Sequence, residues 1–499
     1  MTIDLSQIDP DAVKVVQRLR RFGHEAYLVG GCVRDLLLGK KPKDFDVSTS
    51  ATPPELRRTF RNCRIIGRRF RLAHIFFGPK IFETSTFRAP PREGEDDDKI
   101  AAEGVSEDLL IRRDNVFGTA EQDAQRRDFT INGLFLDPES GQVTDYVNGM
   151  ADIEARLVRT IGDPDIRFRE DPIRILRAVK FAARCELSIE PETLRRMVEH
   201  AQEISKCAQA RVSEEFFRLL RAGAAHRSTE LLVELNLLPV LMPALDEWRR
   251  GKSVPTKPGS RAAATLAEDE PDDYDSVGDD AGASEGDAKV DSAGPATEAG
   301  PVDPQRLWTY LAALDKTTAT SEGSPSNAVV IASLLMPWLY QALAPGSGMR
   351  DVGHMVSHGL RPFIEQLRIS RRDAENTRQL LLMMRHFIPS KQPQRRRPPR
   401  ISNRDLATDL TWLVKVVATA EALEMEALPV IEAPVAAVPV VASSPDTPLP
   451  RLAPRARGAG DLPPIPTLPP ELVGAIVRPA YLGNGTFGRA ISSSSRYAD

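Results

Sequence analysis

Two carboxylates separated by one residue, Asp44 and Asp46, are the first candidate catalytic groups in this chain. Residues 45–49 have the composition of a β-strand, and side chains at i and i+2 of a strand point to the same side. Carboxylates held side by side repel each other, so the pair predicts a positive partner. Two Mg²⁺ ions would meet that need and could clamp an attacking hydroxyl and a triphosphate. The alternative, for this motif alone, is an ordinary solvated strand end.

A glycine pair upstream favours the catalytic interpretation. Gly30 and Gly31 follow the apolar run of residues 26–29 and precede a helical pattern. Such a turn lets backbone N–H groups approach phosphate oxygens closely. It is not a Walker loop, because Arg34 stands where that motif has its first glycine and no Ser or Thr follows Lys40. The spacing therefore predicts a phosphate-binding turn beside a pair of metal-binding carboxylates.

Residues 123–133 contain a second group of polar side chains, Arg126-Arg127-Asp128 followed by Asn132. Surface ion pairs are the plain alternative for this segment. The sequence by itself does not decide whether these side chains form surface ion pairs or belong to a functional site.

A third group lies in residues 170–177. Asp171 followed by Pro172 is typical of a helix N-cap and first helical position, which is one interpretation. However, Arg174 and Arg177 are three residues apart and share a helix face. An Asp and an Arg presented together can hydrogen-bond a base edge, and a further Arg can reach a phosphate.

The elements that would position these groups divide the chain into five parts. Residues 1–150 mix strand-like and helical runs and predict an α/β (α+β) domain. It includes a β-hairpin around residues 78–80 and a helix that begins after Thr52 with Pro53 in its first position. Residues 151–250 and 306–428 have helical periodicity and predict all-α neck and body domains. Residues 251–305 predict an acidic linker without a core, and residues 429–499 a Pro/Ala-rich and Ser-rich tail.

The charge distribution is more informative than its total. The 499 residues include 66 Lys and Arg and 70 Asp and Glu, a net charge of −4. Residues 268–303 hold 13 acidic residues and one Lys, which leaves +8 on the rest of the chain. Seven arginines also lie within 15 residues: Arg57, Arg58, Arg61, Arg64, Arg68, Arg69 and Arg71. Such a cluster predicts salt-dependent binding of RNA or triphosphate near the nucleotide site, rather than a simple solvated charge run.

Composition also indicates the compartment. The four cysteines lack metal-ligand spacing and predict reduced thiols in a cytoplasmic setting. The N-terminal residues lack the apolar core of a secretion signal. The longest apolar run, residues 328–343, is too short for a bilayer and contains Pro337, so no membrane association is predicted.

In their order and spacing, these motifs resemble the class II nucleotidyltransferases, which comprise bacterial poly(A) polymerases and bacterial or eukaryotic CCA-adding tRNA nucleotidyltransferases. The similarity is clear over residues 12–250 and weak over residues 306–425. Residues 146–152 and 159–164 also resemble this family's link into its neck helices. The resemblance implies a polymerase-β-like palm and template-independent addition of nucleotides to RNA 3′ ends, with ATP as substrate and two Mg²⁺ ions.

The resemblance also implies roles for individual residues. Asp44 and Asp46 would be the catalytic metal ligands, and Glu83 is a weaker candidate for a third carboxylate. Gly30, Gly31 and Arg34 would hold the triphosphate. Arg127, Asp128 and Asn132 would contact phosphate and ribose. Asp171 and Arg174 would hydrogen-bond the incoming base, with Arg177 near the phosphates.

The catalytic motifs do not separate polyadenylation from CCA addition, because one site serves both. Three segments resemble the poly(A) polymerase branch more closely: residues 39–46, residues 64–74 and the basic run 395–400. CCA addition remains the alternative. A catalytically idle RNA-binding protein is a further one, although it would have no need of paired metal carboxylates. A nucleotidyltransferase acting on small molecules would leave the basic segments unexplained.

Overall fold

The computed structural model describes residues 3–67, 71–89, 116–251, 303–344, 352–389, 401, 403–424, 428 and 431. Most of the predicted linker 251–305, nearly all of the predicted tail 429–499 and the basic run 395–400 lie outside these residues. So do Arg68 and Arg69. The predicted domain boundaries therefore stay predictions.

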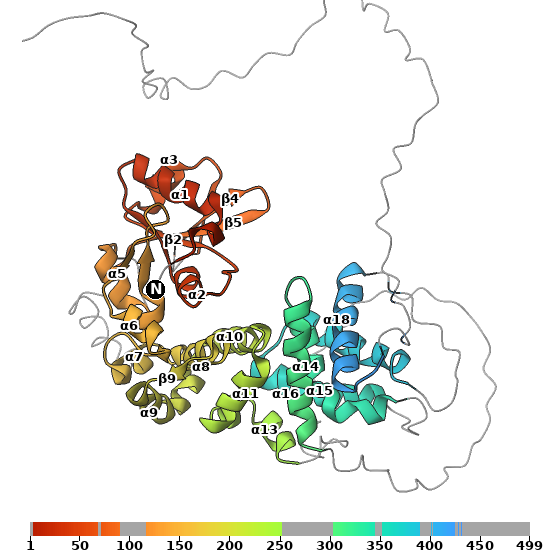
Figure 1. The fold of residues 1–499 in the computed structure, drawn as a ribbon. Helices are drawn as coiled ribbons and strands as arrows, with labels where there is room; N and C mark the ends of the chain where they lie inside the picture. Colours follow the sequence, from red (N-terminus) through yellow and green to blue (C-terminus); the bar gives the residue numbers. More distant parts are fainter. Residues whose placement is uncertain are drawn as a thin grey trace, which may run out of the picture. The chain divides into compact units, whose positions relative to one another are not determined.

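The N-terminal part is built on a seven-stranded mixed sheet with the order β3-β4-β5-β2-β1-β6-β7. Strands β2, β4 and β5 of this sheet are labelled in Figure 1. The neighbours β2 and β5 run parallel, and the other neighbouring pairs are antiparallel. The strands are β1 (Ala26–Val29), β2 (Asp46–Thr49), β3 (Cys63–Ile66), β4 (Leu72–Phe77), β5 (Lys80–Thr86), β6 (Leu134–Leu136) and β7 (Val143–Asp145). The predicted hairpin is confirmed as β4–β5, with Gly78 at φ +58° in its turn.

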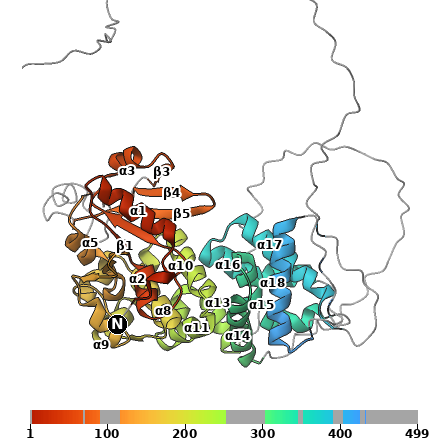
Figure 2. The ribbon, with the colours of Figure 1, turned by 45° about the horizontal axis from the view of Figure 1, so that its top comes forward.

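Helices α1 (Pro10–Arg21), α2 (Gly31–Leu37) and α3 (Pro53–Thr59) contact the sheet, and Figure 2 shows α1 and α3 beside the strands. The predicted start of α3 is confirmed, since Thr52 is its N-cap and Pro53 its first residue. The Glu55 carboxylate accepts from the Thr52 N–H at 2.8 Å and from its hydroxyl at 2.7 Å. Strand alternation buries Val47, Ala73 and Thr84 on the side of α1 and α3 and places Asp46 on the opposite face. That face also carries a smaller apolar cluster around Phe135.

The following part is helical, with a short β8–β9 pair (Leu157–Val158 and Ser188–Ile189). Its helices are α5 (Ala120–Arg126), α6 (Gly149–Glu154), α7 (Pro164–Glu170), α8 (Ile173–Cys185), α9 (Pro191–Glu199), α10 (Gln209–Arg221), α11 (Ala225–Glu234), α12 (Leu238–Leu241) and α13 (Pro243–Arg249). The predicted apolar face of Leu176, Val179 and Ala183 is buried on α8, which contacts α10 and α11. The opposite face of α8 is left free for polar side chains.

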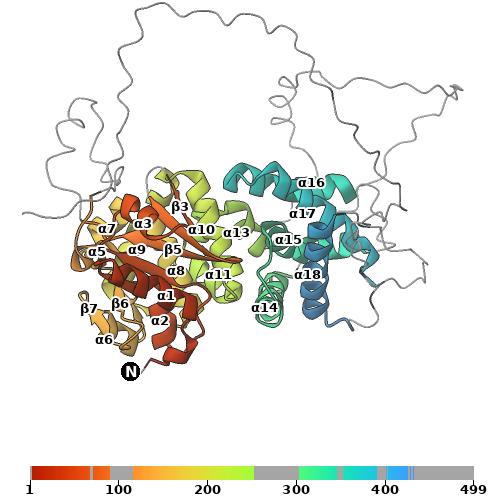
Figure 3. The same ribbon diagram turned by 90° about the horizontal axis from the view of Figure 1, so that it is seen from above.

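Five longer helices form the C-terminal body, and Figure 3 shows them side by side. They are α14 (Gln305–Thr320), α15 (Asn327–Leu343), α16 (Val352–Leu367), α17 (Arg371–Met383) and α18 (Arg404–Ala420). Helix α15 is buried over most of its length, although it contains Pro337. Within the described residues, no helix combines the length and the apolar character needed to cross a bilayer.

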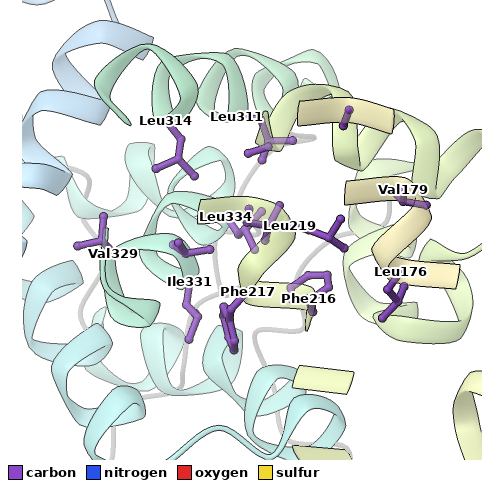
Figure 4. Packing of buried hydrophobic residues seen from close by; sticks show 14 of the residues in the cluster. Leu176, Val179, Phe216, Phe217, Leu219, Leu311, Leu314, Val329, Ile331 and Leu334 are labelled. Carbon is purple, nitrogen blue, oxygen red and sulfur yellow. The ribbon is translucent and has the colours of Figure 1, made fainter. Parts of the chain in front are cut away.

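One continuous apolar core joins the neck helices to the body. In Figure 4, Phe216 and Leu219 of α10 lie near Leu311 of α14 and Leu334 of α15. A half-buried polar contact adds to it, because the Asp315 carboxylate accepts from the first two N–H groups of α11 at 2.6 and 2.9 Å. These contacts fix α8 and α10, which carry part of the site.

Candidate active site

The turn between β1 and α2 brings glycine backbone to the wall of a large cavity. Gly30 has φ +72°, a conformation that requires glycine, and Gly31 is the first residue of α2. A β-carbon on Gly30 would lie 3.4 Å from a guanidinium nitrogen of Arg127, and one on Gly31 would lie 3.6 Å from a guanidinium nitrogen of Arg34. Both glycines and both arginines line the same cavity.

The two predicted catalytic carboxylates also line this cavity. Asp46 is the first residue of β2, whereas Asp44 precedes the strand, so the expectation that both lie on the strand is wrong for Asp44. Parallel pairing of Val47 with Thr84 makes Asp46 and Glu83 neighbours on β2 and β5. Burial and the Glu83 and Asp44 carboxylates raise the pKa of Asp46 to about 6, against the opposing effect of Arg127. The site concentrates negative charge that a cation would relieve.

These carboxylates fit Mg²⁺ only in part. Magnesium prefers oxygen ligands and usually keeps several waters, so a pair of carboxylates with substrate phosphates can suffice. Among the described residues, no three His, Cys, Asp or Glu side chains are grouped closely enough to hold a metal. The exposed Glu83 does not line the cavity, and its carboxylate lies 3.6 Å from His74 Nε2. Asp44 and Asp46 can therefore provide part of the coordination shell of Mg²⁺, with water and substrate phosphates as the remaining ligands.

A chain of buried polar contacts connects α2 to the neck. Arg34, which is 2% exposed, donates from Nε and Nη2 to Asp35 at 3.0 and 2.6 Å and from Nη1 to Asn132 Oδ1 at 2.7 Å. Asn132 Nδ2 in turn donates to Asp128 at 3.1 Å. Asp128 accepts from Arg177 Nε at 2.7 Å. The structure thus brings four of the predicted site residues together as one network.

Electrostatics fixes the charge states of this network. Burial by itself would raise the pKa of Asp128, but the Arg177 guanidinium and hydrogen bonds from Asn132 and the Phe129 N–H lower it to about 2. Asp128 also raises the pKa of Arg177. Both groups are charged at neutral pH, so Arg177 is held in place before any ligand binds. Asn132, with both side-chain groups in use, positions Arg34 and Asp128.

Arg127 reaches the cavity from the end of α5. Its Nη2 donates to Asp123 at 3.0 Å, and its Nη1 donates to the Asn132 carbonyl at 3.3 Å. The guanidinium also lies over the Phe135 ring, 5.3 Å from its centroid. Its buried Nε has no hydrogen-bond partner within the described residues. Arg127 is therefore oriented but keeps a donor unused.

Asp171 and Arg174 are brought together at the start of α8, where both line the cavity. Asp171 is not the N-cap, since Pro172 occupies that position and no side chain caps the helix. Instead, Asp171 Oδ2 accepts from Arg211 Nη2 of α10 at 2.8 Å, and Oδ1 has no hydrogen-bond partner in the described part of the chain. Arg174, 7% exposed, is held by Glu170 and by the carbonyl of residue 167.

Several lining residues were not predicted from the sequence. Lys180, Phe181 and Arg184 continue the α8 face that carries Arg174 and Arg177, so extending the helical spacing would have found them. The Phe181 ring lies 4.8 Å from the Arg34 guanidinium and 5.0 Å from Lys180 Nζ. Residues of α10, including Arg211, Glu215, Arg218 and Arg221, carry no comparable local signal.

The assembled cavity has a volume of about 1280 Å³, room for a nucleotide and more. Eleven Lys or Arg side chains and six Asp or Glu side chains line it. Four of the acidic groups lie at the start of β2 or on α10, and eight of the basic ones lie on α2, α8 or α10. A positively charged cavity with a carboxylate pair on its wall can bind a polyphosphate and deliver metal to it.

The arginine cluster of residues 57–71 lies elsewhere. Arg57, Arg58 and Arg71 line a separate hollow beside α3, and no described member of the cluster lines the large cavity. The expectation that these arginines lie near the nucleotide site is therefore wrong for Arg57, Arg58 and Arg71, because the packing of α3 on β3 and β4 places them around the separate hollow.

Comparison with protein families gives two matches within the chain. Residues 26–159 match the model described as the poly A polymerase head domain. Residues 186–249 match the model described as a probable RNA and SrmB binding site of polymerase A. The first match contains the glycine turn, the carboxylates and Arg127 to Asn132. The second contains α10 with its cavity-lining residues.

Curated relatives fall into two groups by name. The chain is 48% identical over 246 residues to poly(A) polymerase I of Salmonella typhimurium, covering 49% of this chain and 52% of the relative. It is 34% identical over 235 residues to a CCA-adding enzyme of Bacillus licheniformis, covering 47% and 56%. The chain spans about half the length of the curated relatives it matches. A solved CCA-adding enzyme of Bacillus stearothermophilus in complex with CTP aligns with a TM-score of 0.49 at 21% identity, covering 83% of this chain and 78% of that one.

Proposed function

We propose that the chain is a nucleotidyltransferase of the poly(A) polymerase kind, which adds AMP from ATP to RNA 3′ ends without a template and releases pyrophosphate. The matches over residues 26–159 and 186–249 support this proposal. The single observation that carries this proposal is the carboxylate pair Asp44 and Asp46 on the wall of a basic cavity large enough for a nucleotide. Polyadenylation is favoured over CCA addition by the 48% identity to a poly(A) polymerase against 34% to a CCA-adding enzyme.

In this proposal, different residues of the cavity bind the metal ions and the triphosphate. Asp44 and Asp46 would hold two Mg²⁺ ions, which would activate the RNA 3′-hydroxyl and neutralise the triphosphate. The turn at Gly30 and Gly31 and the unused Nε donor of Arg127 bind phosphate oxygens. Because the Asp128–Asn132 network holds Arg34 and Arg177, these guanidinium groups need no reorganisation when the triphosphate enters.

Base selection is proposed for the start of α8. The free Oδ1 of Asp171 can accept a hydrogen bond from a base amino group, while Oδ2 stays bound to Arg211. Arg174 is fixed beside it by Glu170 and by a backbone carbonyl. A carboxylate acceptor and a guanidinium donor that are held rigidly can distinguish one base edge from another.

The proposed setting is cytoplasmic, in keeping with four free thiols.

The test combines substrates with one variant. Purified full-length protein with Mg²⁺ is given either a generic RNA or a tRNA lacking its 3′ end, with ATP alone or with CTP plus ATP. Long A-tails on generic RNA are expected. Addition that stops after C, C and A, and only on tRNA, would establish the CCA-adding alternative.

The variant Asp46→Asn separates an enzyme from an idle RNA-binding protein. We expect it to lower AMP incorporation by more than about 100-fold, since even groups behind metal ligands cost 10–100-fold. RNA binding should persist. Asp11→Asn is the matched control, because Asp11 is a carboxylate on α1 that pairs with Lys14 and Lys80 outside the cavity. Unchanged incorporation by Asp46→Asn would refute the assignment.

A further inference from the structure

A second hollow lies on the N-terminal part, away from the catalytic cavity. It lies between α3, β3 and the start of β4, has a volume of about 510 Å³ and shares no lining residue with the cavity. Its lining residues are Pro53, Pro54, Arg57, Arg58, Ile65 and Arg71. We call this hollow the α3 groove.

The arginines of the α3 groove carry charge that the protein does not neutralise. Arg57, Arg58 and Arg71 are exposed. Their single ion pair among the described residues joins Arg58 to Glu55 at 4.0 Å, and the Glu55 carboxylate is already bound to Thr52. In contrast, Arg34, Arg174 and Arg177 of the cavity each bind a carboxylate within 3.0 Å. Uncompensated guanidinium groups at a concave surface favour a polyanionic ligand.

Strand register connects the α3 groove with the catalytic face of the sheet. Ile65 faces the groove, so its neighbour Arg64 faces the opposite side. On that side Arg64 pairs with His74, and His74 pairs with Glu83, which neighbours Asp46. The path from β3 to β2 takes three strand spacings, about 14 Å. Because β3 is the edge strand, a chain leaving Asp46 can pass Arg64 and turn over the edge into the groove.

The floor of the groove is apolar. Ile65 and the two prolines of α3 provide it, and the arginines stand around it. This combination suits a sugar-phosphate backbone whose sequence does not matter, because phosphates bind the arginines and apolar surface accepts sugars or base faces. It offers no arrangement of fixed donors and acceptors that would read a particular base.

We propose that the α3 groove binds the phosphodiester backbone of the RNA substrate, upstream of the 3′ end held at the catalytic carboxylates. This inference rests on the proposed function, since it assumes that the substrate is RNA. The groove then holds RNA by charge alone and leaves selection of the nucleotide to the cavity. Its contribution increases with the length of RNA available to reach it.

The first test measures RNA binding, which does not depend on catalysis. The full chain with Arg57→Gln, Arg58→Gln and Arg71→Gln is compared with wild type on a 20-nucleotide single-stranded RNA over a range of salt concentrations. The plot of log affinity against log salt has a negative slope, and each lost phosphate contact makes it shallower by about 0.7. Three lost contacts therefore make it shallower by about 2. An unchanged slope would overturn the proposal, whether the groove then serves another partner or none.

A matched control removes the same charge elsewhere. Arg195 and Arg227 are exposed helix arginines and Arg361 is a half-buried one, and each binds a carboxylate. The triple Gln variant at these positions should leave the salt slope within about 0.5 of wild type. A control that lowers the slope as much as the groove variant would show a general charge effect and overturn the proposal. Equal circular dichroism spectra establish that both variants are folded.

The second test measures AMP incorporation on RNA primers of increasing length. The groove variant should lose activity relative to wild type progressively as primers lengthen from 3 to 20 nucleotides. A loss of equal size at every length, or none at any length, would contradict a groove that holds upstream RNA. If wild type incorporates no AMP at all, the proposed function fails, and the salt slopes still decide whether the groove binds RNA.

Discussion

The catalytic cavity and the α3 groove are both rich in arginine, yet they hold it in opposite ways. In the cavity, Arg34 is 2% exposed, and its guanidinium donates hydrogen bonds to Asp35 and Asn132. In the groove, Arg57 and Arg71 are exposed and have no carboxylate within 4.0 Å among the described residues. One set is fixed by the fold before any ligand arrives, and the other stays free to follow its ligand.

This difference matches two physical tasks. Fixed charges stabilise a reacting group without reorganisation, but each needs a carboxylate partner and strongly limits the surrounding sequence. Free charges bind any phosphate backbone and lose strength quickly as salt rises. The comparison predicts that equal substitutions in the two regions have very different effects on stability.

The largest expected effect comes from replacing one arginine in each region by methionine. Arg34→Met leaves the buried Asp35 with Arg184 alone and removes the Asn132 contact, so the free energy of unfolding should fall by about 3 kcal/mol. Arg57→Met should change it by less than about 0.5 kcal/mol. Denaturant unfolding of both variants measures the contrast. If the free energy of unfolding falls by a similar amount in both variants, the distinction between fixed and free arginines is wrong.

A smaller effect is expected from acid. The pKa of Asp128, about 2 against an ordinary 3.8, stabilises the fold above pH 4, and this stabilisation disappears as pH falls through 2. The wild type should therefore lose about 2 kcal/mol more than Asp128→Asn between pH 5 and pH 2. Urea unfolding at several pH values gives the difference between the two. Parallel curves would mean that Arg177 does not hold Asp128 as described.

The smallest expected effect concerns the helix that carries the groove. Thr52→Ala removes a hydroxyl from the capping box of α3 and should lower the free energy of unfolding by about 1 kcal/mol. RNA affinity should stay within twofold, because charge contacts do not require an exact register. Asn403→Ala, which removes the N-cap of α18, is the control of similar cost outside the groove. A tenfold loss of RNA affinity in Thr52→Ala alone would show that the groove is rigid after all.

Local features of the site were predictable because local sequence controls them. The strand before Gly30, the hairpin around Gly78 and the start of α3 at Thr52 each follow from backbone preferences or a capping residue. Carboxylate spacing and the resemblance to a family predicted a set of candidate site residues, and all of them except Glu83 line the cavity.

Two expectations and one alternative interpretation failed where distant contacts decide. Asp171 reads locally as an N-cap, but Arg211 of α10 binds its carboxylate instead. Asp44 was expected on the strand, yet β2 begins two residues later, at Asp46. The cluster around Arg57 was expected near the nucleotide site, but Arg57, Arg58 and Arg71 line the groove because α3 packs on β3 and β4. None of these outcomes is encoded within a few residues.

The sequence by itself determined which groups are available: a glycine turn that needs φ above zero, a carboxylate pair, and arginines in excess once the acidic insert is set aside. Only the tertiary structure decided which arginines are paired and which are free. Pairing depends on the distance between side chains from α2, α5, α8 and α10, and packing sets that distance. The same residue type thus became a fixed part of the cavity in one place and an open anion-binding surface in another.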